Sequence, residues 1–263
     1  MIYFLSDFHL GVPDRASSLA REKKIVAFLD SIKQDASEVY LMGDVFDFWF
    51  EYSKVVPKGY IRLLGKLAEL SDAGIKLHYF TGNHDMWVFD YLPQELNLKI
   101  YRRPITREIN GKKFYLGHGD GLGPGDYGYK FIKKVFASKI CQWLFARIHP
   151  NLGLRIAEFW SGKSRALKDD RQFHGEKEWL FIYSKEILKK EYFDYFIFGH
   201  RHLPIDCRLT PTLSEGEGAL GQPKVGSEAR GKGVSRYINL GEWFDKCSYA
   251  VFDGKELELK YYS

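Results

Sequence analysis

Residues 40–50 read YLMGDVFDFWF, and an apolar run typical of a buried strand ends there in a glycine and a carboxylate. Gly43 and Asp44 come directly after the run, and a second carboxylate, Asp47, follows three residues later. A single Asp after a single strand is commonly a helix N-cap. The pattern becomes informative because other apolar runs of this chain end in the same way.

The first 80 residues alternate between short apolar runs and helical spacing. The expected elements are, in order, a strand at 2–5, a helix at 15–33, a strand at 38–42, a helix at 58–73 that ends at Gly74, and a strand at 75–80. This β-α-β-α-β order is typical of a parallel sheet covered by helices.

The pattern changes after residue 98. Asn110-Gly111 and Asp253-Gly254 each lie between two alternating runs and therefore predict β-hairpins. Another strand is expected at 193–198, and residues 236–244 and 247–262 are interpreted as antiparallel strands. Such a mixed arrangement predicts two packed sheets flanked by helices.

Metal-ligand residues follow each strand expected in the core. They form five blocks: Asp7-x-His9, Gly43-Asp44, Gly82-Asn83-His84-Asp85, Gly117-His118-Gly119-Asp120 and Gly199-His200-Arg201-His202. Because ligands of α/β sheets gather at the carboxyl ends of the strands, we expect the five blocks to meet at one place. The glycines beside the ligands let the backbone turn sharply and approach closely.

The residue types in these blocks suit divalent metals. Imidazole, carboxylate and amide oxygen together favour Mn²⁺, Zn²⁺ or Fe²⁺, and two ions about 3.5–4 Å apart are typical of sites that cleave phosphoryl groups. Asp44 is the best candidate for a carboxylate that bridges two ions, and Asp47 is expected to support it. His78, His149 and His174 are interpreted as ordinary structural residues. The other five of the eight histidines all fall in the blocks, which makes coincidence an improbable explanation.

The ordered series D-x-H, G-D, G-N-H-D, G-H-G-D and G-H-x-H resembles the calcineurin-like binuclear metallophosphoesterases. The resemblance covers the chain apart from residues 127–192 and 209–235. It implies an α/β, four-layer αββα sandwich in which metal-activated water attacks phosphorus. The implied ligands are Asp7, His9, Asp44 and His202 for one ion and Asp44, Asn83, His118 and His200 for the other. His84 is implied to act with Asp44 in catalysis by stabilising charge on the phosphoryl or leaving group.

Residues 127–192 interrupt the strand pattern with mostly helical sequence. Between 127 and 168 there are nine Lys or Arg and one Glu, so this part carries about +8 in a chain whose total is +5. Apolar residues recur there at helical steps of three and four, at Tyr129, Ile132, Phe136, Ile140, Trp143 and Leu144. Three interpretations stay open: a lid packed on the core, a helix at a membrane interface, or a nucleic-acid patch.

This segment resembles the helical cap of the UDP-2,3-diacylglucosamine pyrophosphatases of lipid A biosynthesis, which covers acyl chains. The matching features are H-G-D-x-L-x-x-x-D, which ends at Asp126, and R-I-A followed by Ser164. At the positions of the family pattern S-x-x-x-N-x-x-K, this sequence has Ser164, Lys168 and Arg171. The best-known branch of this subfamily has Arg in the motif G-N-R-D, where this sequence has His84. The implied substrate contacts are Asn83, His84, Asp126, Ser164, Lys168, Arg171 and His200.

This resemblance implies hydrolysis of UDP-2,3-diacylglucosamine to UMP and 2,3-diacylglucosamine 1-phosphate with two Mn²⁺ ions. The expected partners are the lipid-linked nucleotide sugar and the inner-membrane surface, without nucleic acid. Two alternatives stay open: a metallophosphoesterase acting on nucleotides or nucleic acid, and a scaffold that has lost its metals. Oligomeric state is not predicted.

The expected domain organisation is a core formed by residues 1–126 and 193–263 with a helical cap at 127–192. Residues 209–235 contain six glycines and no aromatic residue, which predicts a loop within the core.

Sequence composition also bears on location. The three cysteines are widely separated, which favours a reducing compartment. The N-terminus lacks signal-peptide features, and no stretch approaches ~20 uninterrupted apolar residues. We therefore expect a cytoplasmic protein, and the resemblance to enzymes of lipid A biosynthesis implies that it associates peripherally with the cytoplasmic face of the inner membrane.

Overall fold

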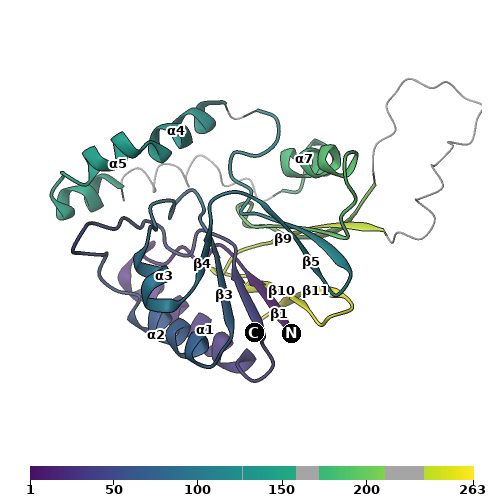
Figure 1. Ribbon diagram of the computed structural model, residues 1–263, viewed down its shortest axis with the longest axis horizontal. Coiled ribbons are helices and arrows are strands. Elements are labelled where there is room, and N and C mark those ends of the chain that lie inside the picture. The colour runs from purple at the N-terminus through teal and green to yellow at the C-terminus, as the bar shows by residue number, and fades with distance from the viewer. Residues whose placement is uncertain (126, 158–171, 211–233) are drawn as a thin grey trace, which may run out of the picture.

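The computed structural model describes residues 1–125, 127–157, 172–210 and 234–263 (Figure 1). Four of the predicted substrate contacts lie outside the described residues: Asp126, Ser164, Lys168 and Arg171. The predicted loop at 209–235 also lies almost entirely outside them.

Six strands form the first sheet, in the order β11-β10-β1-β2-β3-β4. Strands β1 to β4 pair in parallel, whereas β10 pairs antiparallel with both β1 and β11. The bounds are β1 (Ile2–Leu5), β2 (Glu38–Leu41), β3 (Lys76–Phe80), β4 (Lys99–Tyr101), β10 (Ser248–Phe252) and β11 (Leu257–Tyr261). The first three predicted strands and the Asp253-Gly254 hairpin are confirmed, and β4 was not predicted.

Five strands form the second sheet, in the order β5-β6-β7-β9-β8. The bounds are β5 (Ile105–Ile109), β6 (Lys112–Leu116), β7 (Tyr195–Phe198), β8 (Pro204–Leu209) and β9 (Ser235–Leu240). The predicted hairpin at Asn110-Gly111 is confirmed, and both of its turn residues have positive φ. Strand β8 was not predicted.

The antiparallel interpretation of the C-terminal strands is correct for β10 and β11 but only partly correct for β9. Strand β9 runs antiparallel to β8 and parallel to β7, and it lies in a different sheet from β10. The chain changes sheets between them through a turn that begins at Gly241, with φ of 77°. The Glu242 carboxylate accepts hydrogen bonds from the next backbone N–H groups and fixes this turn.

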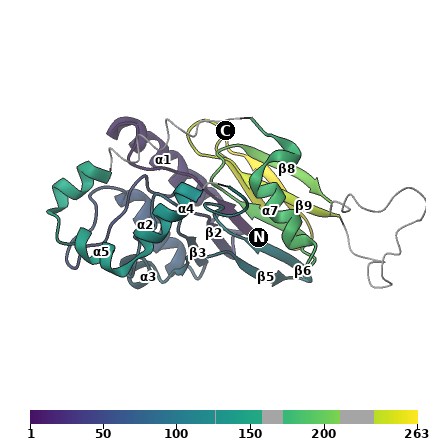
Figure 2. The same ribbon diagram turned by 90° about the horizontal axis from the view of Figure 1, so that it is seen from above.

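Helices cover the outer faces of both sheets, so the layers run α-β-β-α as predicted (Figures 1 and 2). Helices α1 (Arg15–Ile32), α2 (Ile61–Asp72) and α3 (Tyr91–Leu96) pack on the first sheet. Helix α7 (Trp179–Leu188), preceded by the 3₁₀ turn η1 (Gly175–Lys177), packs on the second. Helix α7 lies within the segment expected to be the cap, yet on this packing it belongs to the core.

Aromatic side chains fill the space between the two sheets, which accounts for much of the high aromatic content. Phe4 of β1 stacks on Tyr40 of β2 with ring centroids 4.9 Å apart and reaches Phe114 of the second sheet at 6.2 Å. Phe114 in turn contacts Phe252 at 5.0 Å. This aromatic layer joins the two sheets. The ligand blocks lie at the carboxyl ends of the strands, and we call this edge of the sheets the rim.

Helices α4 (Tyr127–Ala137) and α5 (Lys139–Phe145) form an arm beside the carboxyl ends of the first sheet's strands (Figures 1 and 2). The sequence predicted one amphipathic helix here, but the helix breaks at Ser138, whose backbone is extended. Residues 150–157 are again helical. None of the helices in the described part of the chain is long and apolar enough to cross a membrane.

The aromatic layer should dominate stability. Replacing Phe4 by Ala removes a fully buried ring from between the sheets and is expected to lower the free energy of unfolding by about 3–5 kcal/mol in urea titrations. The matched control is Phe131→Ala, because the Phe131 side chain is 68% exposed and its loss should change stability by about 0.5 kcal/mol or less. Equal losses in the two variants would contradict this account of the core.

Candidate metal centre

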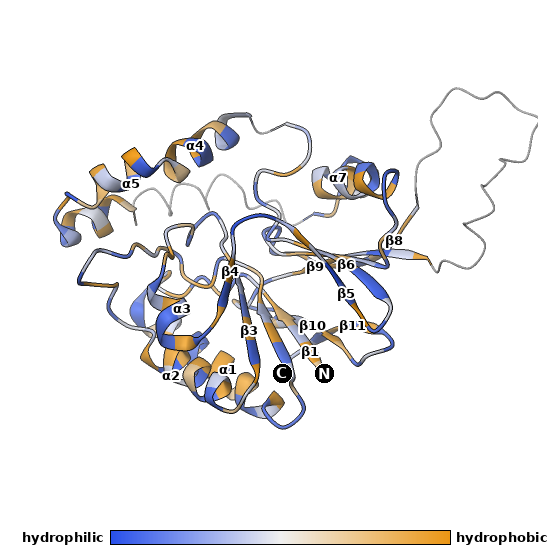
Figure 3. Ribbon diagram, viewed as in Figure 1, coloured by the Kyte–Doolittle hydropathy of each residue, from blue (hydrophilic) through white to orange (hydrophobic). Residues whose placement is uncertain are grey.

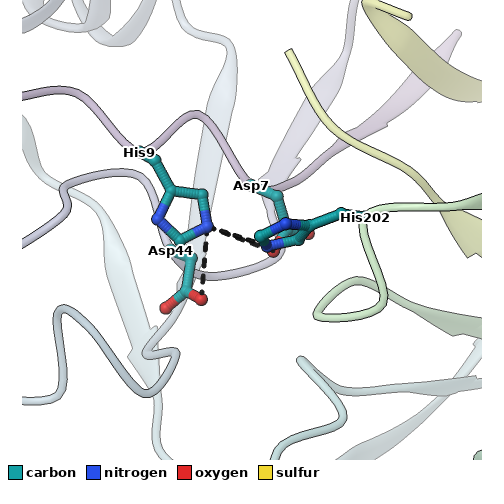
Figure 4. Close-up of side chains that lie close together, drawn as sticks. All are labelled: Asp7, His9, Asp44 and His202. Atoms are coloured by element: carbon teal, nitrogen blue, oxygen red, sulfur yellow. Dashed lines mark hydrogen bonds and ion pairs between the residues drawn. The ribbon is translucent and has the colours of Figure 1, made fainter. Parts of the chain in front are cut away.

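The side chains of the first, second and fifth blocks converge above the sheet rim. His9 Nε2 lies 2.9 Å from His202 Nε2 and 3.6 Å from Asp44 Oδ2 (Figure 4). His202 Nε2 is also 3.2 Å from Asp7 Oδ1. These four residues form a group whose ligand atoms all lie within 4.8 Å of one another. We call it the first donor group.

A second donor group shares Asp44 with the first. His118 Nε2 lies 3.3 Å from Asp44 Oδ2 and 3.3 Å from His200 Nδ1. The amide oxygen of Asn83 is 3.4 Å from the same nitrogen of His118. The structure therefore brings together all seven predicted metal ligands, and a single oxygen of Asp44 faces histidines of both groups.

The histidine tautomers suit metal binding. His9 Nδ1 lies 3.3 Å from Asp47 Oδ1 and His118 Nδ1 lies 2.8 Å from the carbonyl oxygen of Met42, so in both rings Nδ1 carries the proton. In the neutral form of these rings, which is the form that binds metal, Nε2 then has the lone pair and faces the donor groups. Because outer partners of this kind orient metal-bound histidines, the residues present fit two divalent ions.

The charges of the two donor groups also favour binding of a metal cation. Burial alone would raise the pKa of the Asp44 carboxyl group, but the neighbouring His118 and His84 lower it well below its usual value. Burial would lower the pKa of His118, but Asp44 outweighs it and raises that pKa to about 10. In the absence of metal, protonated histidines therefore balance the charge of the carboxylates, and metal binding must release those protons.

Several ligand residues have a backbone conformation that L-residues rarely adopt. The φ angles are positive at Asp7 (56°), His9 (43°), Asp44 (52°), His200 (69°) and His202 (52°). Each left-handed residue of this kind costs on the order of 1–3 kcal/mol and persists only where its surroundings hold it. Hydrogen bonds between blocks provide that support, from Asp7 N to Gly43 O at 3.1 Å and from His9 N to Asp44 O at 2.9 Å.

At two positions only glycine fits, because neighbouring atoms lie too close to leave room for a Cβ atom. A Cβ atom on Gly82 would lie 2.1 Å from Asp44 Oδ1, and one on Gly199 would lie 1.9 Å from Ser6 Oγ. No side chain could be accommodated at either position without moving a ligand loop. The prediction that glycine lets the blocks meet is confirmed at these two positions.

Asp47 and His84 lie beside the first donor group. Asp47 Oδ1 is 3.3 Å from His9 Nδ1 and 3.7 Å from His84 Nδ1. The backbone N–H of His84 donates to Asp44 Oδ1 at 2.9 Å, and its Nδ1 lies 3.0 Å from the carbonyl oxygen of Asp47. The structure thus places His84 against the shared carboxylate, and the support expected from Asp47 is observed as these contacts.

Sequence reasoning missed the role of Asp85. Its carboxylate accepts from Gly82 N at 2.7 Å, Val45 N at 2.8 Å and Tyr79 Oη at 2.5 Å, and burial raises its pKa to about 6. Asp85 therefore ties the second and third blocks together. Its position two residues after Asn83 was the available signal.

Arg201 has a supporting role that was also missed. It lies between His200 and His202 in the sequence, yet its side chain turns away and pairs with the buried carboxylate of Glu178 at 2.8 Å. This ion pair attaches the start of α7 to the loop that carries both histidines. No sequence signal could have revealed it, because the partners are 23 residues apart.

The inner face of the α4–α5 arm contacts Trp87, which follows the third block, and Asp120 of the fourth block. Trp87 Nε1 donates to the Phe136 carbonyl oxygen at 2.8 Å, and the Trp87 and Phe145 rings lie 4.7 Å apart. Lys133 Nζ and Tyr129 Oη both bond Asp120 Oδ2 at 2.5 Å. The lid interpretation is supported for this face of the arm.

The outer face of the arm is apolar and exposed. The side chains that lie there include Tyr127 (80% exposed), Phe131 (68%), Ile140 (71%), Trp143 (56%) and Leu144 (54%). Figure 3 shows hydrophobic and hydrophilic residues alternating along both helices. The predicted apolar stripe is therefore divided: its α4 members Tyr129, Ile132 and Phe136 are partly covered, whereas its last three members face outward.

The family model and a similar protein of nearly the same length indicate one family. The family model for calcineurin-like phosphoesterases matches residues 1–204. A protein of Porphyromonas gingivalis named UDP-2,3-diacylglucosamine hydrolase is 37% identical over 98% of this chain and 96% of its own. One of the same name from Aeromonas salmonicida is 25% identical over 98% and 91%. Among solved structures, the E. coli phosphoesterase Yfce aligns over 97% of this chain and 90% of its own, with 14% identity and a TM-score of 0.44.

Because Asp44 belongs to both donor groups, metal binding should raise the melting temperature only when Asp44 is present. Adding Mn²⁺ at about 100 times its Kd to chelator-treated protein should stabilise it by about 2.7 kcal/mol, which raises Tm by about 5–10 °C in a chain of this size. In Asp44→Ala the rise should be lost, because both donor groups lose a ligand. Asp72→Ala, which removes an exposed carboxylate of α2, should keep it. A full rise in the Asp44 variant would contradict the shared-ligand arrangement.

Proposed function

We propose a substrate from one established premise: this chain belongs to the calcineurin-like phosphoesterase family. The proposed reaction is hydrolysis of the pyrophosphate bond of UDP-2,3-diacylglucosamine to UMP and 2,3-diacylglucosamine 1-phosphate. The observation that carries the proposal is the nearly full-length similarity to the P. gingivalis protein named UDP-2,3-diacylglucosamine hydrolase. In this reaction the oxygen of water bonds to one phosphorus, and the bond from that phosphorus to the bridging oxygen breaks.

We propose Mn²⁺ as the metal, with Zn²⁺ and Fe²⁺ as alternatives that the same donors accept. Asp7, His9, Asp44 and His202 would hold one ion, and Asp44, Asn83, His118 and His200 the other. When bound, the two ions would activate water and neutralise the charge that develops on the phosphoryl group.

His84 is the proposed partner of the phosphoryl group. Its contacts with Asp44 and Asp47 fix the ring beside the donor groups. Burial lowers the pKa of His84, which favours the neutral ring in the absence of substrate. The negative charge of a bound phosphoryl group would favour the imidazolium form, which can donate a hydrogen bond to the leaving oxygen. The proposed substrate contacts also include Asn83 and His200, and Asp126, Ser164, Lys168 and Arg171 from outside the described residues.

We further propose peripheral binding of the enzyme to the cytoplasmic face of the inner membrane through the outer face of the arm. Exposed aromatic and aliphatic side chains alternate there with Lys134, Lys139 and Arg147, none of which is buried. A helix of this composition lies in the headgroup region, where apolar side chains are buried and basic ones meet anionic lipid. Such a position would place the site next to the lipid that carries its substrate.

The substrate proposal is tested by incubating the protein with UDP-2,3-diacylglucosamine and Mn²⁺ and measuring UMP. Release of UMP and the sugar 1-phosphate is expected. Asp44→Ala should lower kcat by a factor on the order of 10³ or more, because groups that stabilise developing charge have effects of this size. Asp72→Ala should keep the wild-type rate.

Two outcomes would contradict the proposal. The first is the absence of UMP with metal supplied. The second is rapid cleavage of DNA, RNA or dinucleoside polyphosphates by a protein that leaves the lipid intact, which would establish the nucleotide or nucleic-acid alternative.

The membrane proposal is tested by co-sedimentation with vesicles. Binding should be stronger to vesicles with about one-third phosphatidylglycerol than to neutral ones and should weaken with salt, because exposed charges are screened. The double variant Phe131→Ser/Trp143→Ser should bind about tenfold or more weakly, as expected for losing burial of two aromatic side chains. Tyr261→Ser, which removes a 59% exposed aromatic of β11, is the control. Equal binding by all three proteins would reject this surface.

A further inference from the structure

Two arginines follow β4, the fourth parallel strand of the first sheet, and lie at the rim. Strands β1, β2 and β3 each end in a ligand block, and β4 lies next to β3 in the same parallel orientation. The bond from Thr81 N to Tyr101 O at 3.0 Å extends this pairing to the carboxyl end of β4. The two residues after β4 are Arg102 and Arg103, so they reach the rim beside the third block.

These arginines line a pocket that includes a donor residue. The residues that line the pocket include Thr81, Arg102, Arg103, His118, Asp120 and Lys133. His118 belongs to the second donor group, and Lys133 comes from the inner face of α4. The pocket therefore lies between the second donor group and the arm.

Two of the three cations in the pocket already have partners. Lys133 Nζ bonds the Asp120 carboxylate at 2.5 Å and the Asp120 carbonyl oxygen at 3.0 Å. The Arg102 guanidinium donates to the carbonyl oxygens of Met86, at 3.0 Å, and Val88. Within the part of the chain that the structure describes, the Arg103 side chain has no hydrogen bond or ion pair, and it is exposed.

Two other arginines near the donor groups form ion pairs or hydrogen bonds with protein atoms. Arg201 pairs with Glu178. Arg21 donates to the carbonyl oxygens of Phe8 and His9 at 2.7 Å. Among these arginines of the described residues, Arg103 is thus the one whose guanidinium has no protein acceptor and can bind a ligand with its full set of donors.

We propose that Arg103 binds the second phosphate of a diphosphate substrate, next to the phosphate that is attacked. The two phosphates of a diphosphate share one oxygen, so a phosphate at the donor groups places its neighbour in an adjoining pocket. The pocket beside His118 supplies the charge and the planar donor fork that phosphate oxygens require. This inference rests on the proposed function only in requiring a diphosphate; it does not depend on the lipid.

The test compares a diphosphate with a substrate that has one phosphate. Arg103→Gln should lower kcat/KM for UDP-2,3-diacylglucosamine by about 10- to 100-fold, the size expected for a lost charged hydrogen bond. Hydrolysis of bis(p-nitrophenyl) phosphate should change by less than about twofold. Arg103→Lys should restore part of the loss, because it returns the charge without the fork. Lys23→Gln, an exposed cation on α1, is the charge-matched control and should leave both substrates unaffected.

A binding measurement separates this inference from the proposed function. Calorimetric titration of the Mn²⁺-loaded protein with methylenediphosphonate should show binding weakened about 10- to 100-fold in Arg103→Gln, with binding of inorganic phosphate nearly unchanged. If the wild-type protein fails to cleave the lipid, the proposed function falls while this titration still decides the role of Arg103. Equal effects of Arg103→Gln on one-phosphate and two-phosphate ligands, or no effect on either, would overturn the inference.

Discussion

The buried Asp44 carboxylate is the constraint on which the rest of the site depends. It is 1% exposed, and a buried charge is tolerated only where it is paired and hydrogen-bonded. One oxygen accepts the backbone N–H of His84, and the other faces His9 and His118. Because three different loops must meet at one carboxylate, their backbones must approach closely, and the left-handed ligand residues and the two close-approach glycines follow from that requirement.

The fold supplies the rigidity that this convergence needs. Parallel strands end at one edge of a sheet, and packing two sheets face to face brings the ends of β6 and β7 to the ends of β1, β2 and β3. The aromatic layer between the sheets fixes the distance between the two sets of loops. Ligand atoms must be held to within fractions of an ångström, and strand ends backed by a packed core achieve this better than free loops.

Much of this arrangement is predictable from the sequence because each ligand block is local. Each block spans at most four residues, and four of the five contain their own glycine, so their type and order can be read without tertiary information. The ion pair of Arg201 with Glu178 could not be predicted, since it depends on where α7 packs. The same holds for the sheet membership of β9 and β10, which a turn at Gly241 decides. The short β4 was missed because three residues carry too little periodicity, and Arg103 was missed with it.

The inner face of the arm packs against the core, whereas its outer face exposes apolar side chains, and this difference bears on the function of the arm. The side chains that pack toward the core, such as Phe136 and Phe145, already contact Trp87. Those on the outer face, such as Phe131 and Trp143, are more than half exposed. Contiguous exposed apolar surface is unfavourable in water and usually marks an interaction site. A substrate that combines acyl chains with a diphosphate would give each face a purpose, since the outer face would meet the lipid surface while the inner face and Arg103 would meet the polar end.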